Sequence, residues 1–579
     1  MSKRKVGRED VATYAIEHNV RGTLNEMLNL TLRQMPEDPI RYLADLLESR
    51  ASNSGIIQAD VKFVKDFMGN TGLEVSIRTS KVNTSFAFSC IDRSVSESDS
   101  IYMDHGKVED EKIRKKLKRR TEEDIERLAD VNAEKLERLE NQEKINLELC
   151  KKIKEFLKSD IFPAILGESP KEPKLLDVTL KSILERSNVT SETDQKEEEE
   201  EEEKEQEKEE KKKKKTDEEE KDNTNTKNEE EIETPYQKLQ RIAVLATSIA
   251  IWKAGAEEKK RPTHDFVANT SRGIDSIMMP VPIVPVISGG VYSRNEMPFD
   301  SIELVPVQSK SYSNAISTCK RIQTRIRSIL EKKKTYYFGV SSNSGATEVF
   351  GLSNVVDALQ IVHEAIEAEN EKGNVKIGIS ASADRYYRAP PSSEAREKRK
   401  IGTYDLGYKT SHKPNVLDES NLTKLYRDAV SDFDVVVIAD PFASDQFGGY
   451  AETTEEFSGS GVQILGKSII TRVNSVQQAA RRSLCNGVCV RLSEMTTVSE
   501  ALEIAKLVKK KGWGLAVSTE TFNLCDPVVA DLAIAMGSRQ IRFGGMMKVS
   551  NARNYDRLKW IEETFEKEVS YAGARFLSS

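Results

Sequence analysis

The sequence lacks the features that mark secreted, membrane-spanning and zinc-stabilised proteins. Its first residues, MSKRKVGRED, contain no apolar signal-peptide core, and no apolar run reaches the roughly 18 residues that a membrane span needs. The six cysteines show no zinc-type pairing, since Cys485 and Cys489 form a wide C-x3-C inside an apolar, strand-like run. We therefore expect reduced, buried thiols in a soluble protein of the cytoplasm or cytoskeleton, with no membrane partner.

The chain also lacks a large excess of charge of one sign. Charged residues make up 32% of its 579 residues, yet the formal net charge is only −7. Opposite charges are therefore interspersed or segregated in blocks, and no global basic signal indicates a nucleic-acid partner. The length allows about two to four domains, one of which could be a barrel of roughly 250 to 300 residues.

The first fifty residues predict a small helical module. Leu24, Met27 and Leu28 continue an amphipathic stretch at helical spacing, and the segment Pro36-Glu-Asp-Pro39 breaks it and starts a second helix. Two short helices cannot bury both of their faces alone, so self-association is expected.

This module carries a resemblance to a known docking fold. The segment MPEDPIRYLADLLESRA resembles the docking-and-dimerisation fold of cyclic-AMP-dependent kinase regulatory subunits and of related flagellar proteins. The resemblance implies a four-helix dimer that receives an amphipathic helix from a scaffold or axonemal partner. An ordinary helical hairpin packed on its own chain is the alternative. The docking groove would contain Met35, Ile40, Leu43 and Leu47.

The middle of the chain changes pattern three times. Alternating apolar residues over 55–90 predict a three-stranded antiparallel meander. Residues 107–157 indicate a charged, solvated helix, and 196–233 are nearly pure Glu and Lys, which predicts a disordered insertion or at most one exposed helix. A helix start follows at Thr234-Pro235.

From Pro280 onwards, short β-rich runs alternate with helical runs. This alternation predicts an α/β fold with a (β/α) barrel, whose working face lies at the carboxyl ends of the strands. The predicted strands are VPIVPVI, TYYFGV, KIGISA, VVVIADPF, VQILG, GVCVRL, WGLAVS and QIRFGG.

Several strings are similar, in order and spacing, to the enolase family, the phosphopyruvate hydratases of glycolysis. They include DFMGNTGLEVSI, RIAVLATSIAIWKAGAEEKK, MPVPIVPVISGG, TYDLGYK, IADPF, GWGLAVS and VVADLAIAMGSRQIRFGG. The resemblance implies an enolase-type (β/α)8 barrel over 275–579 and an α+β capping domain over 53–274. An insertion at about 105–233 interrupts the capping domain, and the helical hairpin over 1–52 precedes it.

The same resemblance implies that the family's metal site and base are lost. It places the three carboxylates of the first magnesium site on Ser380, Ala439 and Lys467. A hydroxyl, a methyl and a cation cannot hold Mg²⁺, so no cofactor is expected. The base lysine falls on Arg491, and a guanidinium, with a pKa above about 12, is a poor proton acceptor.

The other active-site positions are replaced as well. The position of the family's mobile-loop histidine is occupied here by Tyr292. The positions of a histidine-arginine pair in the family are occupied by Thr519 and Glu520. The lysine that steadies the substrate carboxylate falls on Arg542, and the glycine-rich loop offers only Glu348 near its acidic position.

The cations that remain define a substrate-like anion pocket. Buried like charges need a compensating anion. One possibility is internal neutralisation by Asp440, Glu494 and Glu520, with Asp440 as a salt-bridge partner of Lys467. The other is a bound phosphate or carboxylate. The pocket would contain Lys467, Arg491, Arg542 and Ser518.

These features predict an enolase-like pseudoenzyme with a structural or scaffolding role. The docking module, charged insertion and degenerate body together resemble the enolase paralogues of sperm tails and cilia. That resemblance implies a homodimer in the axoneme of a cilium or flagellum, with tubulin or another cytoskeletal surface as a further partner. One alternative is an active phosphopyruvate hydratase that converts 2-phosphoglycerate to phosphoenolpyruvate, and another is a sensor of glycolytic phosphoesters.

Overall fold

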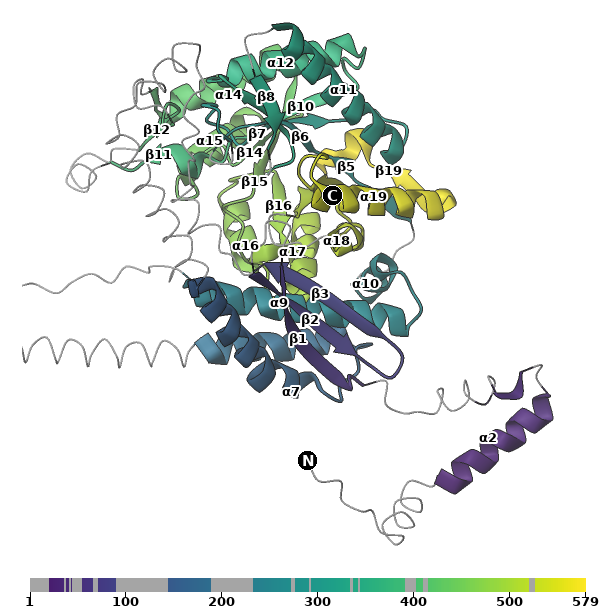
Figure 1. Cartoon of the computed structure of the whole chain (residues 1–579). Helices are drawn as coiled ribbons and strands as arrows, with labels where there is room; N and C mark the ends of the chain where they lie inside the picture. The colour runs from purple at the N-terminus through teal and green to yellow at the C-terminus, as the bar shows by residue number, and fades with distance from the viewer. Residues whose placement is uncertain are drawn as a thin grey trace, which may run out of the picture.

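The chain contains a separate N-terminal helix, α2 (Val20–Gln34), a small three-stranded sheet backed by helices, and a large curled sheet (Figure 1). None of the helices in the described ranges is long and apolar enough to cross a membrane. The computed structural model describes residues 20–35, 38–40, 43, 55–65, 71–89, 144–188, 233–271, 276–290, 293–333, 337–341, 344–390, 402–409, 415–519 and 526–578.

The predicted meander is confirmed. Strands β1 (Gln58–Lys65), β2 (Thr71–Arg78) and β3 (Asn83–Ser89) pair in that order, and both pairings are antiparallel. Alternate residues of β2 point into the core, which is the period-two pattern of a half-buried strand.

Helix α9 (Pro235–Glu258) packs against β2 and β3 and also contacts the barrel helix α17 (Val498–Lys510), so it joins the two parts of the fold (Figure 1). The predicted start is confirmed by a capping box. Thr234 Oγ1 accepts from the backbone N–H of Gln237, and Gln237 Oε1 accepts from the backbone N–H of Thr234. Almost every residue from the second turn onwards is buried, because neighbours cover the helix on all sides.

Residues 144–188 form helices that belong to the core. The prediction of a helix over 107–157 is confirmed for its described part, but the expectation that it is solvated is wrong, because Cys150, Ile153 and Leu157 are fully buried. A π-helical turn, η1 (Leu157–Ile161), and α7 (Phe162–Ile165) continue the first helix. These 45 positions lie inside the range assigned to the charged insertion, and their apolar stripe packs with the small sheet.

Buried polar contacts attach the helix over 173–188 to α9. Asp177 accepts from Ser248 Oγ at 2.6 Å and from Trp252 Nε1 at 2.9 Å. Near the end of the helix, Gln240 Nε2 donates to Ser187 Oγ at 3.0 Å. The residues before the charged tract therefore contact α9, and Thr234, which follows the tract, precedes the same helix.

The large sheet is the predicted α/β barrel. Seven of its strands are parallel neighbours in the order β10-β14-β15-β16-β17-β18-β5. Strand β5 is followed after one residue by β6, which pairs with β7, so a nearly continuous segment closes the barrel. The strands are β5 (Val281–Pro282), β6 (Val284–Ser288), β7 (Ser301–Val305), β10 (Lys376–Ser380), β14 (Val435–Ala439), β15 (Gln463–Gly466), β16 (Gly487–Arg491), β17 (Gly514–Ser518) and β18 (Gln540–Arg542).

The barrel departs from the predicted strand set in two places. Strand β7 was not among the predicted strands, and it runs antiparallel to both of its neighbours, β6 and β10. The run TYYFGV forms β8 (Tyr337–Val340), which pairs with β9 (Thr347–Phe350) in a hairpin at the edge of the sheet rather than as a barrel strand.

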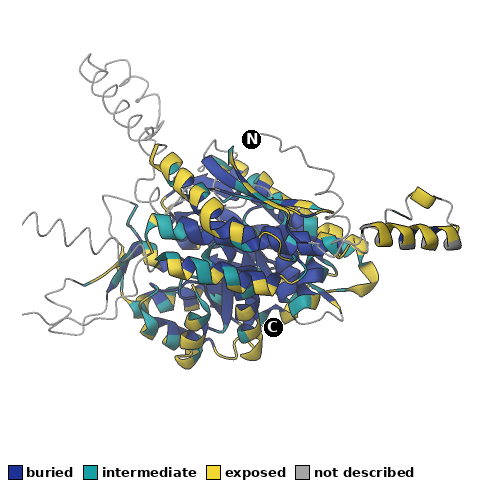
Figure 2. Ribbon diagram, turned by 90° about the horizontal axis from the view of Figure 1, so that it is seen from below, coloured by how far each residue is buried: buried dark blue, intermediate teal, exposed yellow. Residues whose placement is uncertain are grey.

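Helices cover the outside of the barrel, and Figure 2 shows buried strands at the centre with exposed helix faces outside. A second, separate apolar cluster fills the barrel interior and includes Val305, Ala439, Leu465 and Cys489. The covering helices are α10 (Thr263–Ser271), α11 (Tyr312–Lys333), α12 (Val355–Ala368), α14 (Glu419–Phe433), α15 (Phe447–Glu456), α16 (Val473–Arg481), α17, α18 (Val528–Met536) and α19 (Val549–Thr564). The remaining strands are β4 (Ile277–Met279), β11 (Tyr387–Arg388), β12 (Thr403–Asp405), β13 (Val416–Leu417) and β19 (Val569–Tyr571).

Candidate functional site

The carboxyl ends of the parallel strands bring the predicted site residues to one end of the barrel. Register aligns Ser380 with Ala439 across β10 and β14, and it aligns Ser518 with both Arg491 and Arg542. In strand order, the residues at or directly after these ends are Ser380, Ala439, Lys467, Arg491, Ser518 and Arg542. Thr519 follows β17, whereas Tyr292 and Glu520 lie outside the described residues.

The end of β14 is apolar. Ala439 is completely buried and belongs to the cluster that fills the barrel interior, together with Leu465 and Cys489. Its neighbours across the ladder are Ser380 on one side and the strand that leads to Lys467 on the other. A methyl, a hydroxyl and an ammonium do not fit Mg²⁺, which takes oxygen ligands including carboxylates.

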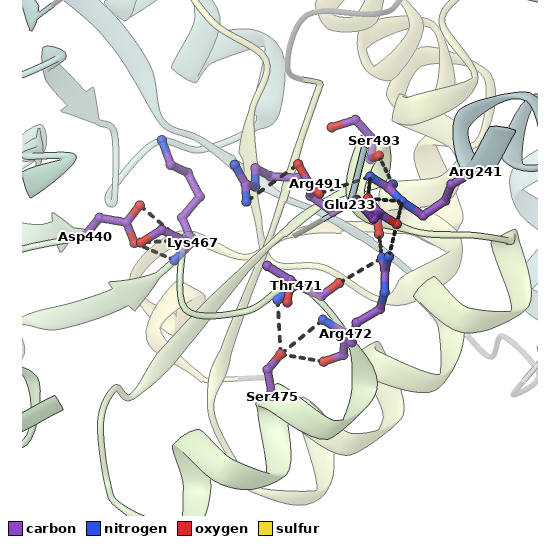
Figure 3. A network of polar contacts seen from close by, with 11 residues as sticks. Glu233, Arg241, Asp440, Lys467, Thr471, Arg472, Ser475, Arg491 and Ser493 are labelled. Atoms are coloured by element: carbon purple, nitrogen blue, oxygen red, sulfur yellow. Dashed lines mark hydrogen bonds and ion pairs between the residues drawn. The ribbon is translucent and has the colours of Figure 1, made fainter. Parts of the chain in front are cut away.

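Asp440, the next residue, holds the backbone of the following loop. Its φ of 48° lies in the left-handed region, which Asp tolerates better than most residues. Its carboxylate accepts from the backbone N–H groups of Lys467 at 2.7 Å and Ser468 at 3.0 Å. We predicted a salt bridge to the Lys467 side chain, but the bond is to its backbone. The ammonium points away from Asp440 and lies 3.5 Å from Ser382 Oγ (Figure 3).

Arg542 has a buried carboxylate partner that sequence reasoning missed. Its Nη2 atom lies 2.5 Å from Glu303 Oε1, and both side chains are less than one-tenth exposed. Ser301 Oγ donates to the same carboxylate oxygen at 3.0 Å. Glu303 lies on β7, and a signal for that strand was present in the alternation of Ile302 and Leu304 around it.

Arg491 belongs to a second charged network (Figure 3). Its Nη2 atom lies 3.8 Å from Glu494 Oε1, so this acid, one of the three considered for internal neutralisation, is near the cation. Glu494 Oε2 also lies 3.4 Å from Arg241 Nη2. Arg241 forms a second ion pair with Glu233, and Glu233 forms another with Arg472. Glu233, Arg241 and Arg472 were not among the predicted site residues, because their contacts join segments far apart in the chain.

Two further groups lie near the loop between β6 and β7. Glu348 is buried, and its Oε1 atom accepts from Ser293 Oγ at 3.1 Å, so this acid faces the loop. Lys409 Nζ donates to the carbonyl oxygens of Gly290 at 2.5 Å and Ser293 at 2.8 Å. Burial lowers the pKa of the Lys409 ammonium to about 8, although the charges of Glu348 and other nearby acids oppose that shift.

A cavity of about 400 Å³ lies away from the strand ends, between the small sheet and the barrel helices. Paired charges line it: Lys253 lies 2.6 Å from Asp526, and Arg557 lies 2.8 Å from Asp531. The complete lining is Glu74, Ser85, Ala87, Lys253, Thr263, Asp526, Pro527, Val528, Asp531, Arg553 and Arg557.

The strand ends combine cations and hydroxyls with an apolar floor. Guanidinium groups stay protonated near neutral pH, so Arg491 and Arg542 can bind anions but are poor proton acceptors. The arrangement suits the binding of oxyanions. Among the residues that the structure describes, no group of three or more His, Cys, Asp or Glu side chains could hold a metal ion.

Comparison with known proteins places this barrel in a family. Residues 276–579 match the family described as the enolase C-terminal TIM barrel domain. The chain is 30% identical over 345 residues to Enolase 2 of Hevea brasiliensis, which covers 59% of this chain and 74% of that relative. It is 29% identical over 345 residues, with the same coverage, to the enolase of Solanum lycopersicum. The chain therefore belongs to the enolase family, as the sequence resemblance implied.

Proposed function

We propose that this chain is an enolase-family protein without enolase activity, which serves as a structural or scaffolding component of a cilium or flagellum. The observation that carries the proposal is the set of residues at the strand ends. Ala439 is a buried methyl among apolar neighbours, and Lys467 and Ser380 flank it. We infer that the protein has no resident metal cofactor.

The size of the expected catalytic loss favours this proposal. Metal ions supply several kcal/mol of charge stabilisation in such reactions, and each 1.36 kcal/mol corresponds to a factor of about ten in rate. Replacement of the base by Arg491 removes a second contribution, since a guanidinium rarely loses its proton. Both losses act on the same reaction step.

An exposed apolar stripe on α2 supports the scaffolding role. Leu24, Leu28 and Leu32 recur every four residues, so they lie on one face of the helix, and 40%, 48% and 67% of their surfaces are exposed. Of the proposed groove residues, Met35 and Ile40 are exposed and Leu43 is half-buried, whereas Leu47 lies outside the described residues. This stripe suits a homodimer that receives the amphipathic helix of an axonemal partner.

A coupled assay for phosphoenolpyruvate tests the catalytic half of the proposal. With 2-phosphoglycerate and excess Mg²⁺, the full chain should give no turnover above an enzyme-free blank. An active enolase serves as the positive control and should produce phosphoenolpyruvate under the same conditions. Magnesium-dependent turnover that Arg491→Ala abolishes would establish the alternative, an active phosphopyruvate hydratase.

A capture experiment tests the scaffolding half. The full chain and a version without residues 1–52 are immobilised and exposed to a synthetic amphipathic helix of the kind that docking-and-dimerisation domains bind. We expect retention only by the full chain. Equal retention by both versions would contradict the assignment of the docking groove, and a separate titration with tubulin tests the cytoskeletal contact.

A further inference from the structure

The carboxylate of Glu233 is held between two arginines from different parts of the fold. Its two oxygens accept from Arg241 Nε at 2.9 and 3.1 Å and from Arg241 Nη2 at 3.0 Å. On the other side, Arg472 Nη2 donates to Glu233 Oε1 at 2.9 Å. Arg241 lies on α9 and Arg472 precedes α16, so the clamp bridges the small domain and the barrel.

The same arginines bind the loop that follows β16. Arg241 Nη1 donates to the carbonyl oxygen of Ser493, and Arg472 Nη1 donates to the carbonyl oxygen of Glu494. These carbonyls lie two and three residues beyond Arg491, and Figure 3 shows the clamp beside Arg491. Both guanidinium groups therefore have contacts to this loop in addition to their contacts with Glu233.

Arg241 requires an anion at this position. Its side chain is only 2% exposed, and a guanidinium buried to that extent is costly unless a negative charge compensates it. Glu494 approaches Arg241 at 3.4 Å but is shared with Arg491. Glu233 supplies the short, bidentate contacts, so its departure would leave a strongly favourable place for another oxyanion.

The position of Glu233 allows its side chain to be displaced from the two arginines. About one-third of its side chain is exposed, and it precedes the capping box, which starts with Thr234. Its displacement would not unwind α9, because the first helical turn is closed by Thr234 and Gln237. Burial alone would raise the pKa of the Glu233 carboxyl, but the hydrogen bond and charge of Arg241 and the charge of Arg472 hold that pKa below its usual value. Near neutral pH, Glu233 is therefore an ionised occupant.

We propose that Arg241 and Arg472 form an oxyanion-binding site for a phosphate monoester, and that Glu233 occupies this site within the same chain. The planar fork of a guanidinium matches the oxygens of a phosphate as well as those of a carboxylate. The site lies beside the strand-end residue Arg491, with which it shares Glu494, but its two arginines are not strand-end residues. It does not depend on whether the protein is catalytic. A phosphate group that displaces Glu233 would detach the end of the charged tract from the barrel.

Calorimetric titration of the full chain with inorganic phosphate tests the site near neutral pH and low ionic strength. The variant Glu233→Gln removes the charge of the internal occupant and keeps its shape. In the wild type, the Glu233 carboxylate competes with phosphate for the two arginines at an effective concentration of about millimolar or higher. Loss of that carboxylate should therefore lower the Kd for phosphate by about tenfold or more. Asp526→Asn is the matched control, because it breaks the Lys253 ion pair far from the clamp.

A double variant, Glu233→Gln with Arg472→Gln, distinguishes this site from other cations. We expect it to lose the phosphate affinity that the single variant gains, while circular dichroism shows the same fold for every variant. The proposal is overturned if Glu233→Gln binds phosphate no more tightly than the wild type and Asp526→Asn. It is equally overturned if the double variant retains the gain.

Discussion

Arg542 Nη2 lies 2.5 Å from Glu303 Oε1, and this buried ion pair joins β18 to β7 on either side of the segment that closes the barrel. The pair places a negative charge beside one of the three cations at the strand ends. Arg542 is therefore held by an acid of the barrel itself, and its capacity to bind an external anion is reduced.

Glu303→Gln should destabilise the protein by about 3 to 5 kcal/mol, because removal of one partner of a buried pair leaves the other charge poorly compensated. Urea denaturation measures the change. Glu563→Gln is the control: its pair with Lys559 is exposed, so a loss of no more than about 0.5 kcal/mol is expected. Equal losses in the two variants would contradict the role of Glu303. The double variant Glu303→Leu with Arg542→Met should recover much of the stability.

Ala439→Asp should lower the free energy of unfolding by about 3 kcal/mol or more, because the new carboxylate enters the apolar cluster that fills the barrel interior. Magnesium should not restore the lost stability, since Ser380 and Lys467 add no carboxylate to the site. Chemical denaturation with and without Mg²⁺ measures both effects, and Ala439→Ser controls for size and neutral polarity. Full rescue by Mg²⁺ would show that a metal site survives at these strand ends.

Lys409 should make stability rise with pH in the alkaline range. Burial lowers its folded pKa to about 8 from an ordinary value of 10.5, so between these values the unfolded chain binds more protons than the folded chain. The charged form therefore penalises the fold below about pH 8, and the penalty disappears as pH rises towards 10.5. The free energy of unfolding of the wild type should therefore rise relative to that of Lys409→Met across this window. Lys320→Met, on the exposed side of α11, is the control, and parallel curves for all three proteins would refute the effect.

Leu28→Asp should weaken self-association of the full chain. The substitution places a charge in the middle of the exposed apolar stripe of α2, where a dimer would have to bury it. Sedimentation velocity over a concentration series measures the change. Asn29→Asp adds the same charge to the same helix about 100° from Leu28 around the helix axis, and it should leave association unchanged. Identical behaviour of the two variants would mean that this stripe does not form the dimer contact.

Local patterns predicted the elements whose signals are contained in their own residues. Apolar alternation predicted the meander, and Thr234 with Pro235 predicted the start of α9, which the capping box confirms. Short β-rich runs between helices predicted the α/β barrel, and the ends of those runs placed Ser380, Ala439 and Arg491 at one end of the sheet.

Long-range pairings could not be predicted in the same way. Nothing near Glu303 in the sequence indicates that it meets Arg542, and nothing near Glu233 indicates Arg472. Asp440 was recognised, but a carboxylate can accept from a backbone amide as well as from an ammonium, and only the left-handed turn at this residue selects the amide. The burial of the helices over 144–188 was missed because their narrow apolar stripe lies among many charges.

The described residues before and after the charged tract both contact α9, and this has a consequence for sequence change. Ser187 binds Gln240 on one side of the tract, and Thr234 caps the helix on the other. The closure entropy of a connecting segment grows slowly with its length, by about 0.6 kcal/mol for each doubling. From closure entropy alone, we expect insertions and deletions between these two anchors to change the free energy of folding little.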